Sequence, residues 1–393
     1  MNNEKITIKA KYSTQAIFLV CGLAISSWAP MVPIAKHRLG LNDANLGLLL
    51  LLLGLGAIVM MPVSGYLTHK YGTRIVILVS GLVAAISLPF LLIMPEPISM
   101  GITLFIFGAG VGTIDVAMNS HGIHVQNKYG KPIMSSLHGL FSVGGLFGSL
   151  GLGILIKMGL QPLAAAIAIS VLLIVILVFN FPTLFTKAIE KESIEKDIKE
   201  ENVQQSSRWV WLNFSVIFLG FACFAVFLSE GAMLDWSALF LKENRSVGPE
   251  LAGIGYAAFS IAMALMRLLG DRIVERLSGK TVVVGGGLLA AFGIFIAVSL
   301  PWLQTTLLGF VLLGIGAANI VPVFFSEGGK IKGVPTSISI PAISTMGYAG
   351  QLAGPALLGF VAYHFSLPLA LGLTGCLLFI VAVCYALKIK QGK

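Results

Sequence analysis

Long apolar runs recur along the chain, and each is about as long as a helix that crosses a membrane. Such a helix needs about 20 mostly apolar residues to span the hydrocarbon core of a bilayer. Twelve windows of the sequence meet this requirement, and polar segments separate them. We therefore predict an all-α integral membrane protein with twelve transmembrane helices. The predicted spans are 13–35, 45–68, 74–94, 99–123, 135–157, 162–184, 209–238, 250–271, 280–299, 303–326, 337–362 and 367–389.

One long polar segment divides the spans six and six. Residues 185–208 read FTKAIEKESIEKDIKEENVQQSSR, with mixed charge and neither glycine nor proline. We interpret this segment as a cytoplasmic linker. It predicts an N-terminal six-helix bundle over 1–184 and a C-terminal six-helix bundle over 209–393.

Composition and charge placement agree with this topology. Charged residues make up 11% of the chain, against about a quarter in soluble proteins, and the mean hydropathy is +0.92. With both termini in the cytoplasm, 21 of the 26 Lys and Arg residues fall on inner segments, Arg267 among them, and 5 fall outside. This is the bias of the positive-inside rule. The net charge of +9 therefore reports topology, and we expect no nucleic-acid partner.

Several classes of function find no support in the sequence. The four cysteines lie inside apolar runs without metal-ligand spacing and form no disulfide framework. No nucleophile–base set, phosphate loop or metal constellation occurs, so we predict no enzyme activity, metal site or cofactor. The basic N-terminus MNNEKITIKAK leads into an apolar run without a small-residue cleavage site. We interpret that run as a retained first span.

The two halves of the sequence resemble each other. GVGTID at 110–115 matches GIGAAN at 314–319, and HKYGTR at 69–74 matches ERLSGK at 275–280. Trp28 falls opposite Trp236. The offsets are 204, 206 and 208 residues, so the matches predict one duplicated six-helix unit, a recurrent plan among transporters.

The loop after the second span carries the residues of a family resemblance. GYLTHKYGTR resembles the signature Gly-x-x-x-Asp-Arg/Lys-x-Gly-x-Arg/Lys of the major facilitator superfamily. Gly65, Lys70, Gly72 and Arg74 match this signature, while His69 stands at the position of the acid.

The counterpart loop in the second half of the sequence supports the resemblance to the superfamily, and four other segments indicate one branch of it. The counterpart loop GDRIVERLSGK has Glu275, Arg276 and Lys280 at charged positions, with Asp271 and Ser278 at the glycine positions. GVGTIDVAMN, HGLFSVGGLFG, SEGAMLDWSALFL and GYAGQLAGPALLGF are similar to a bacterial branch grouped with the fucose permease, although the first span here lacks that protein's acid. The resemblance implies a monomeric secondary transporter of the bacterial inner membrane that imports a small polar, sugar-like solute with protons by alternating access.

The resemblance also implies a gate on the cytoplasmic side. In the family, charges of the two loops clamp the halves together when the cavity opens outward. Charge pairs that form in one state and break in the other bias a two-state equilibrium. The corresponding residues here, which also determine topology, are His69, Lys70, Arg74, Asp271, Arg272, Glu275 and Arg276.

Asp115 is an acid inside the fourth span. It lies roughly 6 Å from the middle of that span along the helix, where a carboxylate costs about 2.5–3.5 kcal/mol. Gly108, Gly112, Asp115 and Asn119 follow the spacing of one helix face. We predict a proton carrier or solute anchor; the alternative is a hydrogen bond that holds two helices together. Asn319 occupies the matching depth in the second half.

The seventh span holds two further acids. Glu230 lies roughly 9 Å from the middle of the span, and Asp235 lies nearer its outer end. Residues five positions apart point about 140° apart around a helix, so the two acids cannot share a face. We predict that Glu230 binds a proton or solute and that Asp235, beside Trp236, belongs to an outer gate or to the membrane interface.

Histidine and amphipathic side chains supply the remaining candidates. His138 begins the fifth span, where it either titrates near neutral pH or makes an interfacial hydrogen bond. We expect His121 and His124 to be exposed near a loop. Predicted cavity-lining residues are Trp28, with an interfacial anchor as its alternative, Ser27 and Gln351.

Two other functions fit the same architecture. One is export of a metabolite or amphiphile by proton antiport. Drug exporters of the superfamily carry a Gly-Pro element in the fifth span, whereas here Gly354 and Pro355 lie in the eleventh. The other is a non-transporting sensor or scaffold, for which Asp115 and the charged loops would serve no purpose.

Overall fold

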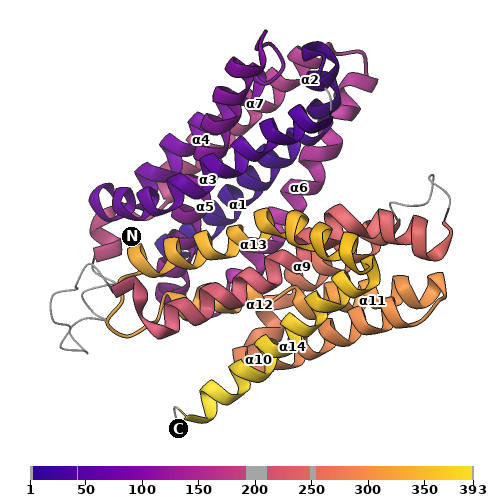
Figure 1. The fold of residues 1–393 in the computed structure, drawn as a ribbon. Coiled ribbons are helices and arrows are strands. Elements are labelled where there is room, and N and C mark those ends of the chain that lie inside the picture. Colours follow the sequence, from indigo (N-terminus) through magenta and orange to yellow (C-terminus); the bar gives the residue numbers. More distant parts are fainter. Residues whose placement is uncertain (1–2, 42, 192–209, 248–253, 392–393) are drawn as a thin grey trace. The chain divides into compact units, whose positions relative to one another are not determined.

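The structure of the chain, a computed structural model, is built of helices (Figure 1). It describes residues 3–41, 43–191, 210–247 and 254–391. No strand occurs among these residues. Helices suit a membrane because they satisfy the backbone hydrogen bonds within one segment.

The helices follow the predicted spans closely. The first half contains α1 Asn3–Ser27, η1 Ala29–Met31, α2 Val32–Leu39, α3 Asp43–Tyr71, α4 Thr73–Phe90, α5 Pro97–Tyr129, α6 Met134–Lys157, α7 Pro162–Asn180 and η2 Phe181–Thr183. The second half contains η3 Val210–Leu212, α9 Phe214–Arg245, α10 Ile254–Ser299, α11 Leu303–Ala317, α12 Ile320–Gly328, α13 Thr336–His364 and α14 Leu367–Gln391.

Three helices of the second half do not match the predicted spans one to one. By length and composition, 9 helices of the described residues can cross a membrane. One of them, α10, is 46 residues long and contains the predicted spans 250–271 and 280–299. The predicted span 303–326 is divided between α11 and α12.

The chain forms two compact units. Among the described residues, unit 1 takes in those of Met1–Ile133, Leu140–Asn213 and Gly329–Ala342. Unit 2 takes in those of Met134–Gly139, Phe214–Gly328 and Ile343–Lys393. The first residues of α6 therefore group with the helices of the second half.

Gly72 and Ser278 give the two halves the same turn. Gly72 precedes α4 with φ 84° and ψ 153°, and Ser278 interrupts α10 with φ 68° and ψ 151°. This region of backbone space is almost restricted to glycine. Ser278 stands at the glycine position of the repeated loop, so it holds a strained glycine conformation and bends α10 between its two spans.

Two arginines fasten corresponding helix ends. Arg38 donates from Nη2 to the carbonyl of Leu91, just after α4, at 3.2 Å. Arg245 donates from Nη2 to the carbonyls of Ala297 and Leu300, at the end of α10, at 2.7 Å each. The last carbonyls of a helix have no intrahelical donor, and cations are favourable there. These two charges, which sequence analysis places outside, thus have structural roles.

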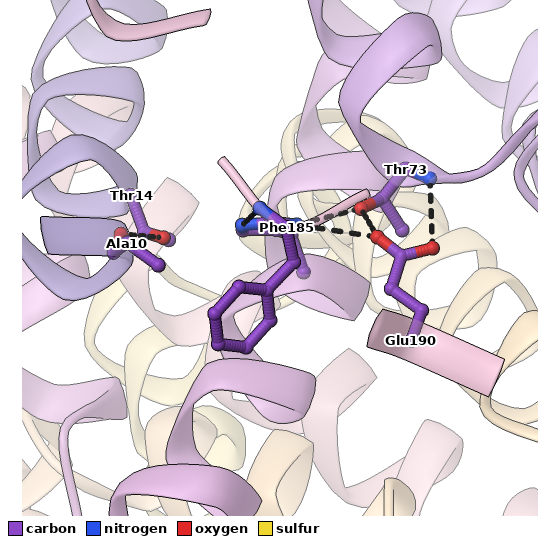
Figure 2. A network of polar contacts seen from close by, with 6 residues as sticks. Ala10, Thr14, Thr73, Phe185 and Glu190 are labelled. Carbon is purple, nitrogen blue, oxygen red and sulfur yellow. Dashed lines mark hydrogen bonds and ion pairs between the residues drawn. The ribbon is translucent and has the colours of Figure 1, made fainter. Parts of the chain in front are cut away.

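The beginning of the predicted linker packs against unit 1. Residues 187–191 are helical, and Glu190 is only 5% exposed. Its Oε2 accepts a hydrogen bond from the backbone N–H of Thr73 at 3.2 Å, and its Oε1 accepts one from the Thr73 hydroxyl (Figure 2). The first residues of the segment thus form an anchor on α4, while 192–208 lie outside the described residues.

His121 completes this anchor from α5. Its Nδ1 lies 2.6 Å from the Thr73 hydroxyl oxygen and 3.4 Å from Oε1 of Glu190. Its Nε2 accepts a bond from the Phe185 N–H at 3.4 Å, which assigns the ring proton to Nδ1 in the neutral imidazole. His121 is 0% and His124 7% exposed, so the expectation that they are exposed near a loop was wrong.

Replacing Ser278 tests the strained turn. We expect Ser278→Gly to stabilise unit 2 by about 1–3 kcal/mol, the usual cost of such a backbone conformation, and to raise the apparent Tm in detergent by several degrees. Ser278→Ala is the matched control, because it removes the hydroxyl and keeps the strain. Equal Tm values for the two variants would contradict the assignment of strain.

The anchor predicts a dependence on pH. Burial raises the pKa of the Glu190 carboxyl, but the hydrogen bond from His121, the charges that His121 and His124 acquire on protonation, and the Thr73 hydroxyl together lower it below 4.5. An acid whose pKa falls on folding stabilises the fold above its unfolded pKa, and this contribution disappears as the pH falls through the folded value.

Hydrogen exchange of the Phe185 and Thr73 amides measures this contribution. At neutral pH we expect Glu190→Gln to lower the protection factors of these amides about tenfold, equivalent to about 1.4 kcal/mol. Acidification should lower the same protection factors in the wild type, each observed rate being compared with the intrinsic exchange rate at its own pH. The control is Glu243→Gln, an exposed acid of α9. Unchanged exchange in Glu190→Gln would show that the anchor contributes nothing.

Candidate functional site

A buried ion pair joins α9 to α10 in unit 2. Nη2 of Arg267 lies 2.8 Å from Oε1 of Glu230, with the two side chains 8% and 18% exposed. Arg267 comes 11 residues before the bend at Ser278, or roughly 16 Å along the helix. The pair therefore lies deep in a membrane-spanning segment. Such a pair must offset a large desolvation cost, and losing one partner is strongly unfavourable.

A proline explains why the guanidinium lies at this place. Pro322 has no N–H, so the carbonyl of Ala318, four residues earlier, lacks its helical donor. The helix is interrupted between α11 and α12 at this point. Nε of Arg267 donates to the Ala318 carbonyl at 3.1 Å. The Arg267 side chain thereby supplies the hydrogen-bond donor that the Ala318 carbonyl lacks. The same bond fixes the direction of the guanidinium group.

Asn319 lies next to this junction and is 3% exposed. Its Nδ2 donates to the carbonyl of Met266 at 3.0 Å. A Cβ atom on Gly270 would lie 1.9 Å from Oδ1 of Asn319, so only glycine leaves room for the amide. The asparagine that sequence analysis pairs with Asp115 therefore ties the α11–α12 junction to α10.

The first turn of α6 reaches the same helix. The backbone N–H of Ser136 donates to Oδ1 of Asp271 at 3.1 Å. A carboxylate at a helix N-terminus is favourable because it meets unpaired N–H groups and the positive end of the helix dipole. His138 is 9% exposed, with its ring centroid 5.6 Å from that of Phe325. It is therefore a buried residue of unit 2.

Asp115 belongs to unit 1, where it is 5% exposed on α5. Nδ2 of Asn119 donates to the Asp115 backbone carbonyl at 2.9 Å and lies 3.4 Å from its Oδ1. A Cβ on Gly108 would lie 1.9 Å from the carbonyl oxygen of Leu53, and the glycine at 112 meets α3 in the same way. The glycines of this face thus allow the backbones of α5 and α3 to approach each other closely.

The other predicted site residues divide between the two units. Ser27 donates to the carbonyl of Leu23 within its own helix at 2.7 Å. Trp28 is 5% exposed, and its buried indole N–H has no acceptor within the described part of the chain. Asp235 is exposed on α9, and Gln351 is exposed on α13, where its main chain passes Gly231. Ser27 and Trp28 belong to unit 1, and Asp235 and Gln351 belong to unit 2.

The predicted gate residues divide between the two units. In unit 1, His69 and Lys70 are exposed, and the guanidinium of Arg74 lies 4.1 Å from the ring centroid of Phe181. In unit 2, the exposed members are Arg272, Glu275 and Arg276. Their action as a gate remains a prediction.

Sequence reasoning missed two charged residues. Sequence analysis counted Arg267 with the cytoplasmic charges, and this was wrong. Arg267 lies in the apolar stretch IAMALMRLLG, inside the predicted span 250–271, and this position could have indicated a buried charge. Without it, 20 inner charges remain against 5 outer ones. The other is Glu327, near the end of α12, whose Oε1 accepts a hydrogen bond from the hydroxyl of Tyr385.

Comparisons with known proteins identify the family. The Major Facilitator Superfamily model matches residues 16–329. An uncharacterised transporter of this superfamily from Yersinia pestis is 45% identical, over 95% of this chain and 94% of that protein. Membrane protein MosC of Rhizobium meliloti is 30% identical, over 93% of this chain and 85% of that protein.

Solved structures show the same fold at low sequence identity. The Escherichia coli fucose:proton symporter gives a TM-score of 0.73 at 15% identity, over 96% of this chain and 99% of that one. A human organic anion transporter gives 0.74 at 14% identity, over 96% and 99%. A proton:xylose symporter gives 0.74 at 14% identity, over 97% and 95%. The chain has the twelve-helix major facilitator fold, and it belongs to the major facilitator superfamily, a class of membrane transporters that are not enzymes.

Proposed function

We propose that this transporter imports a small polar, sugar-like solute together with protons by alternating access between two six-helix bundles, 1–184 and 209–393. We place it, as a monomer, in a bacterial inner membrane with both termini in the cytoplasm. The bacterial relatives support this setting. Among proteins of the same fold, one is named a fucose:proton symporter and another a proton:xylose symporter.

The observation that carries the proposal is the buried pair of Glu230 and Arg267. A carboxylate inside a membrane-spanning segment is expensive and marks a functional site. Glu230 has two states: the ionised form pairs with Arg267, and the protonated form releases the guanidinium. A pair that forms in one state and breaks in another connects proton binding to conformation.

Asp115 is the second acid of the proposal. It lies on the membrane-spanning helix α5 and is almost fully buried. It gives unit 1 a carboxyl that can take up a proton or contact the solute. In this proposal, the cytoplasmic loops with His69, Asp271 and their neighbouring charges provide the gate.

Neutralising each acid separately tests proton coupling. In proteoliposomes containing a pH-sensitive dye, we expect Glu230→Gln to reduce solute-driven proton entry and uphill accumulation at least about tenfold, or about 1.4 kcal/mol. Exchange of labelled for unlabelled solute should continue, because it requires no net proton movement. Asp115→Asn tests the second acid by the same two measurements.

Glu243→Gln is the matched control, since it removes an exposed acid from the end of the same helix. Proton-coupled accumulation that survives in both Glu230→Gln and Asp115→Asn would overturn the roles assigned to these acids. Solute entry that drives protons out of the proteoliposomes, or uphill solute export driven by proton entry, would instead support the antiport alternative.

A further inference from the structure

The segment that follows α7 lies against the turn between α3 and α4, residues 69–74, where the predicted gate residues of unit 1 occur. Nζ of Lys187 donates to the backbone carbonyl of Lys70 at 2.6 Å. A Cβ atom on Gly72 would lie 2.9 Å from the Cβ of Lys187, so the absence of a side chain at position 72 lets the segment come this close. The segment therefore packs directly on the turn.

Glu190 makes the buried contact with this turn. Its Oε2 accepts a bond from the backbone N–H of Thr73 at 3.2 Å, and its Oε1 accepts one from the Thr73 hydroxyl (Figure 2). Thr73 begins α4, and the first N–H groups of a helix have no acceptor within the helix. A carboxylate there forms charge-assisted bonds and meets the positive end of the helix dipole. Glu190 thus fixes the point at which α4 begins, whereas the bond of Lys187 is exposed.

The turn contains no acid in its own sequence. Residues 69–74 read HKYGTR, with the exposed His69 at the position where the superfamily signature has an acid. The carboxylate of Glu190 reaches the turn from a segment far along the chain. The segment after α7 thus provides a charged group that the sequence of the turn lacks.

Aromatic residues of the same segment extend the contact. The guanidinium carbon of Arg74 lies 4.1 Å from the ring centroid of Phe181. Phe185 is 1% exposed, and its backbone N–H donates to Nε2 of His121 at 3.4 Å. The same imidazole completes the anchor on α4. We call residues 181–190 the brace, because they contact the turn and the helices on which it depends.

We propose that the brace holds the α3–α4 turn in position and that Glu190 is a positioning residue for transport. The inference rests on the proposed function, in which Lys70 and Arg74 at the turn belong to the cytoplasmic gate. A charge can act in a gate only from a defined place, because its interaction energy falls with distance. Glu190 in this role contacts no solute and carries no coupled proton; it determines where the gate charges lie.

Cysteine labelling measures the position of the turn without transport. Thr68, near the end of α3, is 6% exposed, and its carbonyl accepts the N–H of Gly72 at 2.8 Å, so Thr68→Cys reacts with a maleimide when the turn opens. We expect Glu190→Gln to speed this reaction about tenfold through loss of the charge-assisted bonds. Glu190→Asp should have a smaller effect, and Lys187→Met about a twofold effect because its bond is exposed. Mass spectrometry identifies the labelled peptide.

Uptake kinetics separate a positioning role from a merely structural one. Proteoliposomes are tested with fucose, xylose, glucose and galactose, and the variants are compared on the sugar that the wild type takes up fastest, per amount of folded protein. We expect Glu190→Gln to lower the maximal rate about tenfold and to leave the KM within about twofold, since gate movement is impaired and solute binding is not. Glu190→Asp should recover part of the rate, because it keeps a carboxylate. Lys191→Gln, at an exposed position of the same helical turn, is the matched control and should behave like the wild type in both measurements.

Each contrary outcome has a distinct meaning. Labelling that Glu190→Gln leaves unchanged would show that the carboxylate does not hold the turn. Faster labelling together with wild-type uptake would overturn the positioning role and leave the proposed function standing. A raised KM at an unchanged maximal rate would assign Glu190 to solute binding and also overturn that role.

Two further results remain decisive. If Glu190→Gln does not fold, Glu190→Asp and Lys187→Met test the brace by the same two measurements. If the wild type takes up none of the four sugars, the proposed sugar import fails and the transport role of Glu190 fails with it. The labelling rates still decide in that case whether the brace holds the turn.

Discussion

The core of a bilayer supplies no water to a peptide group, so each backbone N–H and C=O in it needs a partner within the protein. Helices meet this requirement except where proline removes a donor. Pro322 creates such a place, and the carbonyl of Ala318 accepts from Arg267 instead. A guanidinium inside the membrane needs an anion, and Glu230 supplies one at 2.8 Å. The interrupted helix, the cation and the acid thus form one connected arrangement.

The two halves share backbone geometry more than chemistry. Gly72 and Ser278 adopt nearly the same dihedral angles, although only the glycine does so without strain. Arg38 and Arg245 both fasten the end of a helix. The polar residues inside the spans differ between the units. Unit 2 has the pair of Glu230 and Arg267 together with Asn319, and unit 1 has Asp115 with Asn119. The two units thus share a turn and a helix-end contact and differ in the polar residues inside their spans.

Membership of the family shows the general function of the chain, and the buried charges concern the residues inside its spans. The family and the fold identify a membrane transporter, and they cover many solutes and coupling schemes. The buried charges address a narrower question, because they show which ionisable side chains lie inside the membrane-spanning helices of this chain. The packing of Glu190 against Thr73 and His121 adds a second arrangement, in which the segment that leaves unit 1 is held by a carboxylate.

The sequence alone determined the fold class, the twelve spans and the repeat, because these depend on local properties: the length of apolar runs, the bias of charge and the spacing of motifs. It also located Asp115 and Glu230 inside apolar runs, since an acid in such a run is visible without a structure, and their roles stay a prediction. It placed Arg267 with the cytoplasmic charges and expected His121 to be exposed, and both were wrong. Only the tertiary structure decided these cases, because a buried charge or imidazole is defined by partners far away in the sequence. Glu230 and Ala318 reach Arg267 from separate helices, and Thr73 and Glu190 reach His121 in the same way.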